Sequence, residues 1–150
     1  MKSVFQTATT DELSARINTL KPTTPALWGK MNVSQMLAHC CVSYEMVYEN
    51  IHKAPNGFLK LMLRLFAKDS VVGDKPYKKN GPTAAAFIIT TEKDFEREKA
   101  RLIAYIEKTR DLGESFFDNK ESLSFGKLTV AQWNTMFYKH LDHHLSQFGV

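Results

Sequence analysis

The sequence predicts an all-α fold, a bundle of four long helices with one short helix added. Apolar residues recur at helical spacing along most of the 150 residues, and two of the predicted helices begin with the same capping motif. Hydrophobic residues make up 43% of the chain, enough for a core that buries about two thirds of the unfolded surface. We therefore expect one helical-bundle domain over residues 1–150.

The first predicted helix runs from about Asp11 to Leu20. Thr9 and Glu12 have the spacing of a capping box at its start. Pro22 follows closely and predicts its end, because proline cannot continue a helix. The second helix is expected from about Val33 to Asn50.

A long crossover, Ile51–Thr91, separates the second helix from the next long one. After a turn at residues 55–57, the apolar run from about Phe58 to Ala67 predicts a short helix. The following segment, Lys68–Ala84, is rich in glycine and proline and predicts an exposed loop. Residues Phe87–Ile89 fit either an isolated strand or an extended segment.

Two more long helices complete the predicted bundle. One spans about Glu92 to Leu112, with Thr91 at its start and Gly113 at its end. The last spans about Val130 to Gln147.

An internal repeat fixes two helix starts. Residues 28–36 (WGKMNVSQM) match residues 125–133 (FGKLTVAQW) in residue type at each position. In each copy the fifth residue, Asn32 or Thr129, is typical of an N-cap, and the glutamine three residues later, Gln35 or Gln132, completes a capping box. The second and last helices are therefore predicted to start at residues 33 and 130.

Composition narrows the function classes. The net charge is +4, and the basic residues look scattered, which argues against a nucleic-acid-binding protein. The polar amino terminus and the absence of a long apolar run predict a cytoplasmic protein with no membrane partner. Cys40 and Cys41 are neighbours on a helix, so we expect two reduced, buried thiols rather than a disulfide or the usual metal pair.

The last helix carries the strongest functional signal. His140 and His144 are four residues apart, so both imidazoles can point at a single ion. Both fall on or beside the apolar stripe of Trp133, Phe137 and Leu141, and the competing interpretation is a pair of hydrogen-bonded core histidines. A catalytic zinc-type site takes three protein ligands, so a third must come from elsewhere.

The distance of His39 from the start of its helix makes it the candidate for that third ligand. His39 lies about 10 Å from the start of its helix, at about 1.5 Å per residue, while His140 and His144 lie roughly 16 to 22 Å from the start of theirs. The three meet only if the two helices are antiparallel. His143 is expected to face solvent or to serve as a donor behind the ligands, and His52 is expected at the surface.

These residues resemble the DinB-like, metal-binding four-helix-bundle superfamily, and within it an uncharacterised bacterial branch. The resemblance rests on residues 28–39 and 125–149, and it covers nearly the whole chain. It implies an up-down-down-up topology with the short helix as an addition in the crossover. It also implies that His39, His140 and His144 hold a divalent ion, zinc, nickel or iron, with Gln147 three residues beyond the last ligand.

Three neutral imidazoles with an open position suit such an ion, which can activate a bound water or thiol. The resemblance further implies a thiol-dependent S-transferase or isomerase that uses a low-molecular-weight thiol on a small electrophilic substrate. No carboxylate qualifies as a general base, because Glu45, Glu49 and Asp142 project away from the histidines. The alternative is a non-catalytic module in which the ion or the histidines stabilise the bundle or a homodimer.

Overall fold

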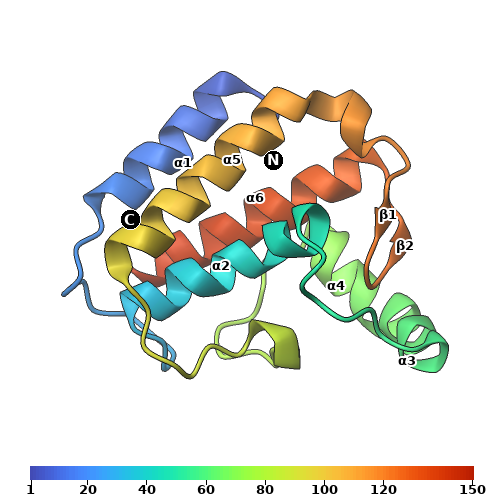
Figure 1. Ribbon diagram of the computed structural model, residues 1–150, viewed down its shortest axis with the longest axis horizontal. Helices are drawn as coiled ribbons and strands as arrows, with labels where there is room; N and C mark the ends of the chain where they lie inside the picture. Colours follow the sequence, from blue (N-terminus) through green and yellow to red (C-terminus); the bar gives the residue numbers. More distant parts are fainter.

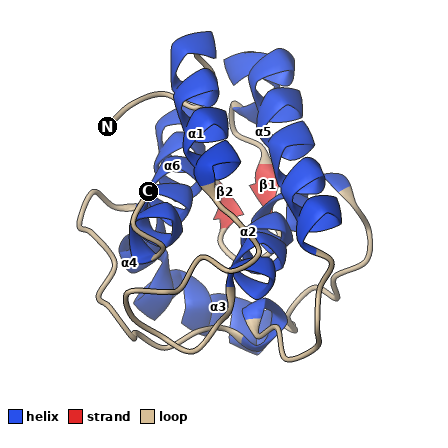
Figure 2. Cartoon of the chain, turned by 90° about the vertical axis from the view of Figure 1, so that its left-hand side faces the viewer, coloured by secondary structure: helices blue, strands red, loops and turns tan.

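The computed structural model describes residues 1–150, and four long helices form its main body. Helices α1 (Thr7–Thr19), α2 (Val33–Tyr48), α5 (Phe95–Phe117) and α6 (Val130–Gln147) pack side by side around a shared core (Figures 1 and 2). Figure 1 shows α6 running in the opposite direction to α2, the relation that the histidine depths require. The predicted helical class is confirmed. No helix is both long and apolar enough to cross a membrane.

Both predicted capping boxes are confirmed. The Asn32 side chain accepts from the Gln35 backbone N–H at 2.8 Å, and the Gln35 side chain accepts from the Asn32 N–H at 3.1 Å. Thr129 and Gln132 form the same reciprocal pair at the start of α6. Helix α6 has the predicted bounds, whereas α2 ends at Tyr48, two residues before the prediction.

The predicted start of α1 is wrong. The helix begins at Thr7, and its N-cap, Gln6, makes no side-chain capping bond. Thr9 cannot serve as the cap because it is buried on the inner face of the helix, and the Glu12 side chain pairs with Lys2 instead.

The predicted bounds of α5 are wrong at both ends. Asp94, not Thr91, caps the helix by accepting from the Arg97 N–H at 2.8 Å. Gly113 breaks the helix as expected, with φ of 68°, but a further helical turn continues to Phe117. That turn is favourable because it buries the Phe117 ring completely in the core.

The crossover is more helical than predicted. Helix α3 (Gly57–Met62) continues through a π-helical segment, η1 (Leu63–Ala67), into α4 (Lys68–Val72). We refer to residues 57–72 as the arm, because α3 projects from the four long helices whereas α4 at the other end packs against α6 (Figure 1). The expected loop beginning at Lys68 is therefore wrong for the five residues of α4.

Two smaller elements also differ from expectation. Phe87 closes a 3₁₀ turn, η2 (Ala85–Phe87), Ile88 after it has extended φ and ψ, and residues 87–89 form no strand, so the strand alternative is wrong. The sequence did not indicate the hairpin of β1 (Glu121–Ser122) and β2 (Gly126–Lys127), an antiparallel pair just before α6.

Aromatic rings from α2, α5 and α6 fill the centre of the core. The Tyr44 ring stacks on Phe137 at 4.7 Å between centroids, and Phe117 packs against Trp133 at 5.5 Å. Both predicted core cysteines, Cys40 and Cys41, are buried and reduced.

Lys139 is buried although it lies off the apolar stripe of α6. Its ammonium group donates to the backbone carbonyls of Ser70, Gly73 and Lys75, at the end of the arm and just beyond it. The crossover is thus fixed to α6 beside the predicted histidine site.

Candidate metal centre

The three predicted histidines meet inside the bundle. His39 comes from α2 and His140 and His144 from α6, and one ring nitrogen from each lies within 4.8 Å of the other two. The three residues are only 5% to 8% exposed. This convergence follows from the antiparallel packing of α2 and α6, which brings the middle of one helix beside the last third of the other (Figure 1).

The His39 ring is held from the crossover. Its Nδ1 lies 2.8 Å from the Phe87 carbonyl oxygen, which can only accept, so Nδ1 carries the hydrogen. The Phe87 ring also makes edge contacts with His39 and His140, at centroid distances of 5.3 and 5.7 Å. Turn η2 therefore orients His39 and covers one side of the cluster.

The His140 ring is held by Ser43, one helical turn beyond His39 on α2. Its Nδ1 lies 3.3 Å from the Ser43 Oγ. The Ser43 hydroxyl donates its only hydrogen to the Cys40 carbonyl at 2.9 Å, so it accepts from His140. This pairing also assigns the His140 ring hydrogen to Nδ1.

The His144 ring is held by Gln147, three residues later on α6. Its Nδ1 lies 2.8 Å from the Gln147 Oε1. The Gln147 Nε2 donates to the Trp28 carbonyl at 2.6 Å, which fixes the amide with its oxygen toward the histidine. Gly29, with φ of 86°, lies directly against this amide, and a Cβ at this position would push the amide aside.

The hydrogen-bond partners leave one unprotonated nitrogen, Nε2, on each of the three rings. With every ring hydrogen on Nδ1, each Nε2 retains a lone pair that can bind a metal. The Nε2 atoms of His39 and His140 are 3.0 Å apart, close to the about 3.3 Å between two ligands of a tetrahedral zinc at about 2.0–2.1 Å bond length. The three histidines could therefore hold a metal ion, with each ring oriented by a partner behind it.

Burial keeps these histidines neutral. It lowers the pKa of His39 and lowers that of His140 well below the ordinary value. It also lowers the pKa of His144 to about 3, and the nearby His39 adds to the effect. Neutral imidazole is the form that binds metal, so the rings need lose no proton near neutral pH.

A large groove, about 2040 Å³, opens onto the cluster. Its floor includes the three histidines, and its walls come from α2, the arm, the rest of the crossover and the loop between β1 and β2. Many of the wall residues are apolar, among them Met46, Val47, Leu63, Phe125 and Met136. The cluster is thus accessible from a cavity that could hold a small, largely apolar molecule.

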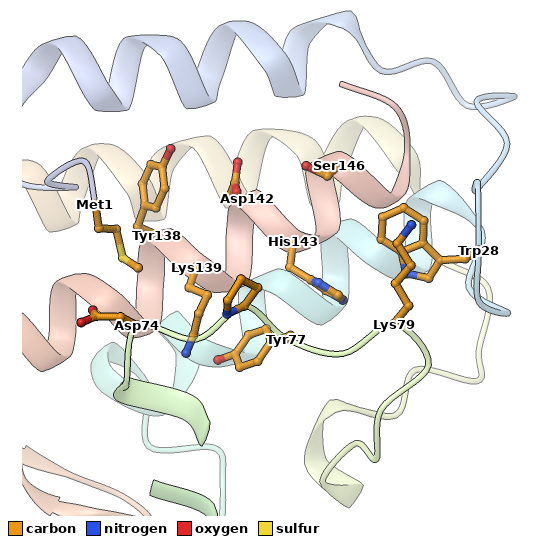
Figure 3. Close-up of a pocket in the computed structure, with 11 residues that line it drawn as sticks. Met1, Trp28, Asp74, Tyr77, Lys79, Tyr138, Lys139, Asp142, His143 and Ser146 are labelled. Atoms are coloured by element: carbon orange, nitrogen blue, oxygen red, sulfur yellow. The ribbon is translucent and has the colours of Figure 1, made fainter. Parts of the chain in front are cut away.

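His143 lies beside the cluster, and its ring makes an edge contact with His144 at 5.0 Å between centroids. The half-buried ring also makes edge contacts with Trp28 and Tyr77 at 5.8 and 5.6 Å between centroids. It also lines a smaller pocket of about 300 Å³, where the Lys79 ammonium lies over the Trp28 ring (Figure 3). The ring is thus partly open to solvent, as expected, and it donates no hydrogen bond to the three histidines.

The acidic groups that we expected to point away do so. Glu45 pairs with Arg101 and with His52, which is half-buried rather than fully on the surface. Asp142 pairs with Arg16 at 2.8 Å on the other side of α6. No carboxylate belongs to the cluster.

Sequence reasoning missed two residues that orient the ligands. Ser43 could have been found, because it is four residues after His39 and shares the same edge of α2. Phe87 contributes a backbone carbonyl, which any residue type possesses, so no sequence signal marks it.

Fold and site together define a mostly helical protein with a buried three-histidine group that could hold a metal ion. The profile of a family described as a protein of unknown function, DUF1569, matches residues 2–149. The chain therefore belongs to this family. No curated protein and no solved structure matches it.

Proposed function

We propose that this protein is a divalent-metal-dependent enzyme in which His39, His140 and His144 hold the ion. The observation that carries this proposal is the meeting of three buried imidazoles whose ring nitrogens lie within 4.8 Å of one another, each ring held by a partner on Nδ1. Without a cation the Nε2 lone pairs of His39 and His140 repel one another in a buried setting, where electrostatic interactions are strong. Zinc, nickel and iron all accept imidazole ligands.

Three protein ligands favour a catalytic role over a structural one. Structural zinc sites are closed by four protein ligands, whereas catalytic sites keep a position open. The cluster contains three such groups and opens onto the groove. When bound, the ion would lower the pKa of a coordinated thiol or water and so supply a nucleophile near neutral pH.

The nucleophile would come from outside the chain. Burial raises the pKa of Cys40 and raises that of Cys41 to about 12, so neither thiol ionises readily. Both also belong to the core rather than to the groove lining. A low-molecular-weight thiol is therefore the proposed co-substrate, and the reaction is an S-transfer to, or isomerisation of, a small electrophile.

Residues other than the three ligands would bind the substrate or orient the imidazoles. The apolar groove walls would hold the electrophile and exclude water from it. Ser43, Gln147 and the Phe87 carbonyl would hold the imidazoles in place by accepting their Nδ1 hydrogens.

We also propose that α1, α2, α5 and α6 form the DinB-like up-down-down-up bundle. The opposite directions of α2 and α6 support this, and so does the crossover, which is long enough to let α5 run the same way as α2 (Figure 1). The arm would then be an addition to the bundle.

Cobalt(II) provides the test, because its visible spectrum reports coordination. We expect cobalt to bind once per chain, and we expect added 2-mercaptoethanol to produce a thiolate-to-cobalt charge-transfer band. His144→Ala should abolish both signals, and His143→Ala should retain them. Cobalt binding without any response to thiol would refute the thiol-dependent reaction and leave the non-catalytic, structural role as the better explanation.

A further inference from the structure

The arm exposes an apolar face that nothing in the chain covers. Phe58, Leu61, Met62 and Leu65 follow the i, i+3, i+4, i+7 spacing of one helix face. Phe58 is 74% exposed and Leu65 is 65% exposed. No residue of α3 or η1 is buried. A contiguous exposed face of this kind marks an interaction surface, unlike the scattered single apolar residues found on most proteins.

The charge of the chain is concentrated on the same crossover. Residues 51–84 contain seven Lys or Arg and two Asp or Glu, which gives a net charge of +5. The rest of the chain contains 13 Lys or Arg and 14 Asp or Glu. Basic residues occur along the whole chain, but the net charge is concentrated in this segment because acidic residues are scarce there. Within residues 51–68 there is no acidic residue at all, and the basic ones are Lys53, Lys60, Arg64 and Lys68.

The basic side chains lie beside the apolar face rather than on it. Lys60 points back toward the bundle and pairs with Glu121 at 2.9 Å. The Arg64 guanidinium lies next to Gly126 in β2, on the same flank. This division, apolar outward and cationic along the flank, is the pattern of a helix that lies in the interface of an anionic bilayer.

We infer that the arm docks on an anionic phospholipid membrane, with Phe58, Leu61, Met62 and Leu65 inserted among the lipids. The exposed Lys53 and Arg64 beside this face supply positive charge that attracts the anionic headgroups. A second copy of the chain fits less well, because a two-fold contact would bring two segments of net charge +5 together. The groove opens beside the arm, so an apolar substrate could pass from the bilayer to the histidine cluster.

Vesicle co-sedimentation tests this inference with the untagged protein. We expect binding to vesicles of phosphatidylcholine with roughly one third phosphatidylserine, and at least about tenfold weaker binding to phosphatidylcholine alone. Raising salt from about 0.1 M to about 1 M should release the protein, because it shortens the screening length from about 10 Å to about 3 Å.

Two exposed apolar residues give matched variants. Phe58→Ser and Leu65→Ser should each weaken binding by about tenfold or more, as expected for losing one inserted side chain. Leu27→Ser removes a side chain that is 68% exposed but lies outside the arm, and it should leave binding unchanged. Thermal unfolding of each variant confirms that it is folded.

Two double variants test whether the basic residues beside the arm contribute to vesicle binding. Lys53→Gln with Arg64→Gln should weaken binding to the anionic vesicles, whereas Lys21→Gln with Lys108→Gln, exposed residues outside the crossover, should not. The inference is overturned if neither vesicle binds the protein, or if Phe58→Ser and Leu65→Ser bind like wild type. It is also overturned if sedimentation equilibrium reveals a dimer that Leu65→Ser dissociates, since a second copy then covers the arm.

Discussion

The Nε2 atoms of His39 and His140 lie 3.0 Å apart, although the partners of both rings assign their hydrogens to Nδ1. Two lone pairs at this distance are stable only with a proton or a cation between them. Burial opposes the proton, because it lowers the pKa of both histidines. A cation held between the two nitrogens would remove the repulsion between their lone pairs, which supports the proposed metal centre.

Removing the metal should destabilise the protein. At a free metal concentration about 100 times Kd, the bound ion contributes about 2.7 kcal/mol, so chelation should lower Tm by about 5 to 10 °C. Differential scanning calorimetry with and without chelator measures this shift. His144→Ala serves as the control and should show no chelator effect; an equal shift in both proteins would mean that the chelator acts elsewhere.

Ser43→Ala should weaken metal binding without unfolding the protein. The substitution leaves the His140 Nδ1 hydrogen without its acceptor, and losing such a partner lowers metal affinity by about 10- to 100-fold. Competition with a chromophoric chelator gives the affinity. Ser34→Ala, near the start of the same helix, is the matched control and should bind metal like wild type.

Gly29→Ala should affect the metal site from a distance. Its Cβ would displace the Gln147 amide that orients His144, so we expect metal affinity to fall by about tenfold. Gly113 is the control, because it also has positive φ but has open space around it. Both alanine variants should lose about 1–3 kcal/mol of stability, because a residue with a Cβ is strained at positive φ. Equal metal affinity in the two variants would argue against a role for Gln147.

Acid should destabilise the metal-free protein through His144. Its pKa is about 3 in the folded state and 6.5 ordinarily, so the unfolded state binds the proton more readily as pH falls below about 6.5. The contribution of His144 to the free energy of unfolding is therefore complete above pH 6.5 and decreases as the pH falls to about 3. By about pH 5 the loss from this group is about 2 kcal/mol.

Urea unfolding of the metal-free protein at pH 7.5 and pH 5 measures this loss. His144→Gln cannot take up the proton, so its stability should depend less on pH. A pH dependence identical to wild type would show that His144 does not titrate as described.

The parts of the fold that the sequence predicted depend on local chemistry. The capping boxes at Asn32 and Thr129 involve residues three apart, so their geometry is set within one helical turn. The His140–His144 pair is equally local, and the depth of His39 followed from a fixed start and a constant rise.

What the sequence did not predict depends on distant contacts. The last turn of α5 forms after Gly113 because Phe117 enters a core made by other helices. The Phe87 carbonyl reaches His39 across 48 residues, and Lys139 is buried only because the crossover passes over it. The three histidines themselves needed an assumption about helix direction that no local pattern supplies.

Metal content is the most direct test of the central claim. The protein should be expressed without a histidine tag, purified without a nickel column and analysed by inductively coupled plasma mass spectrometry. We predict about one equivalent of zinc, nickel or iron per chain, and almost none in His39→Ala, His140→Ala or His144→Ala. Less than about a tenth of an equivalent in the wild-type protein, with none gained on incubation with these ions, would contradict the proposed centre.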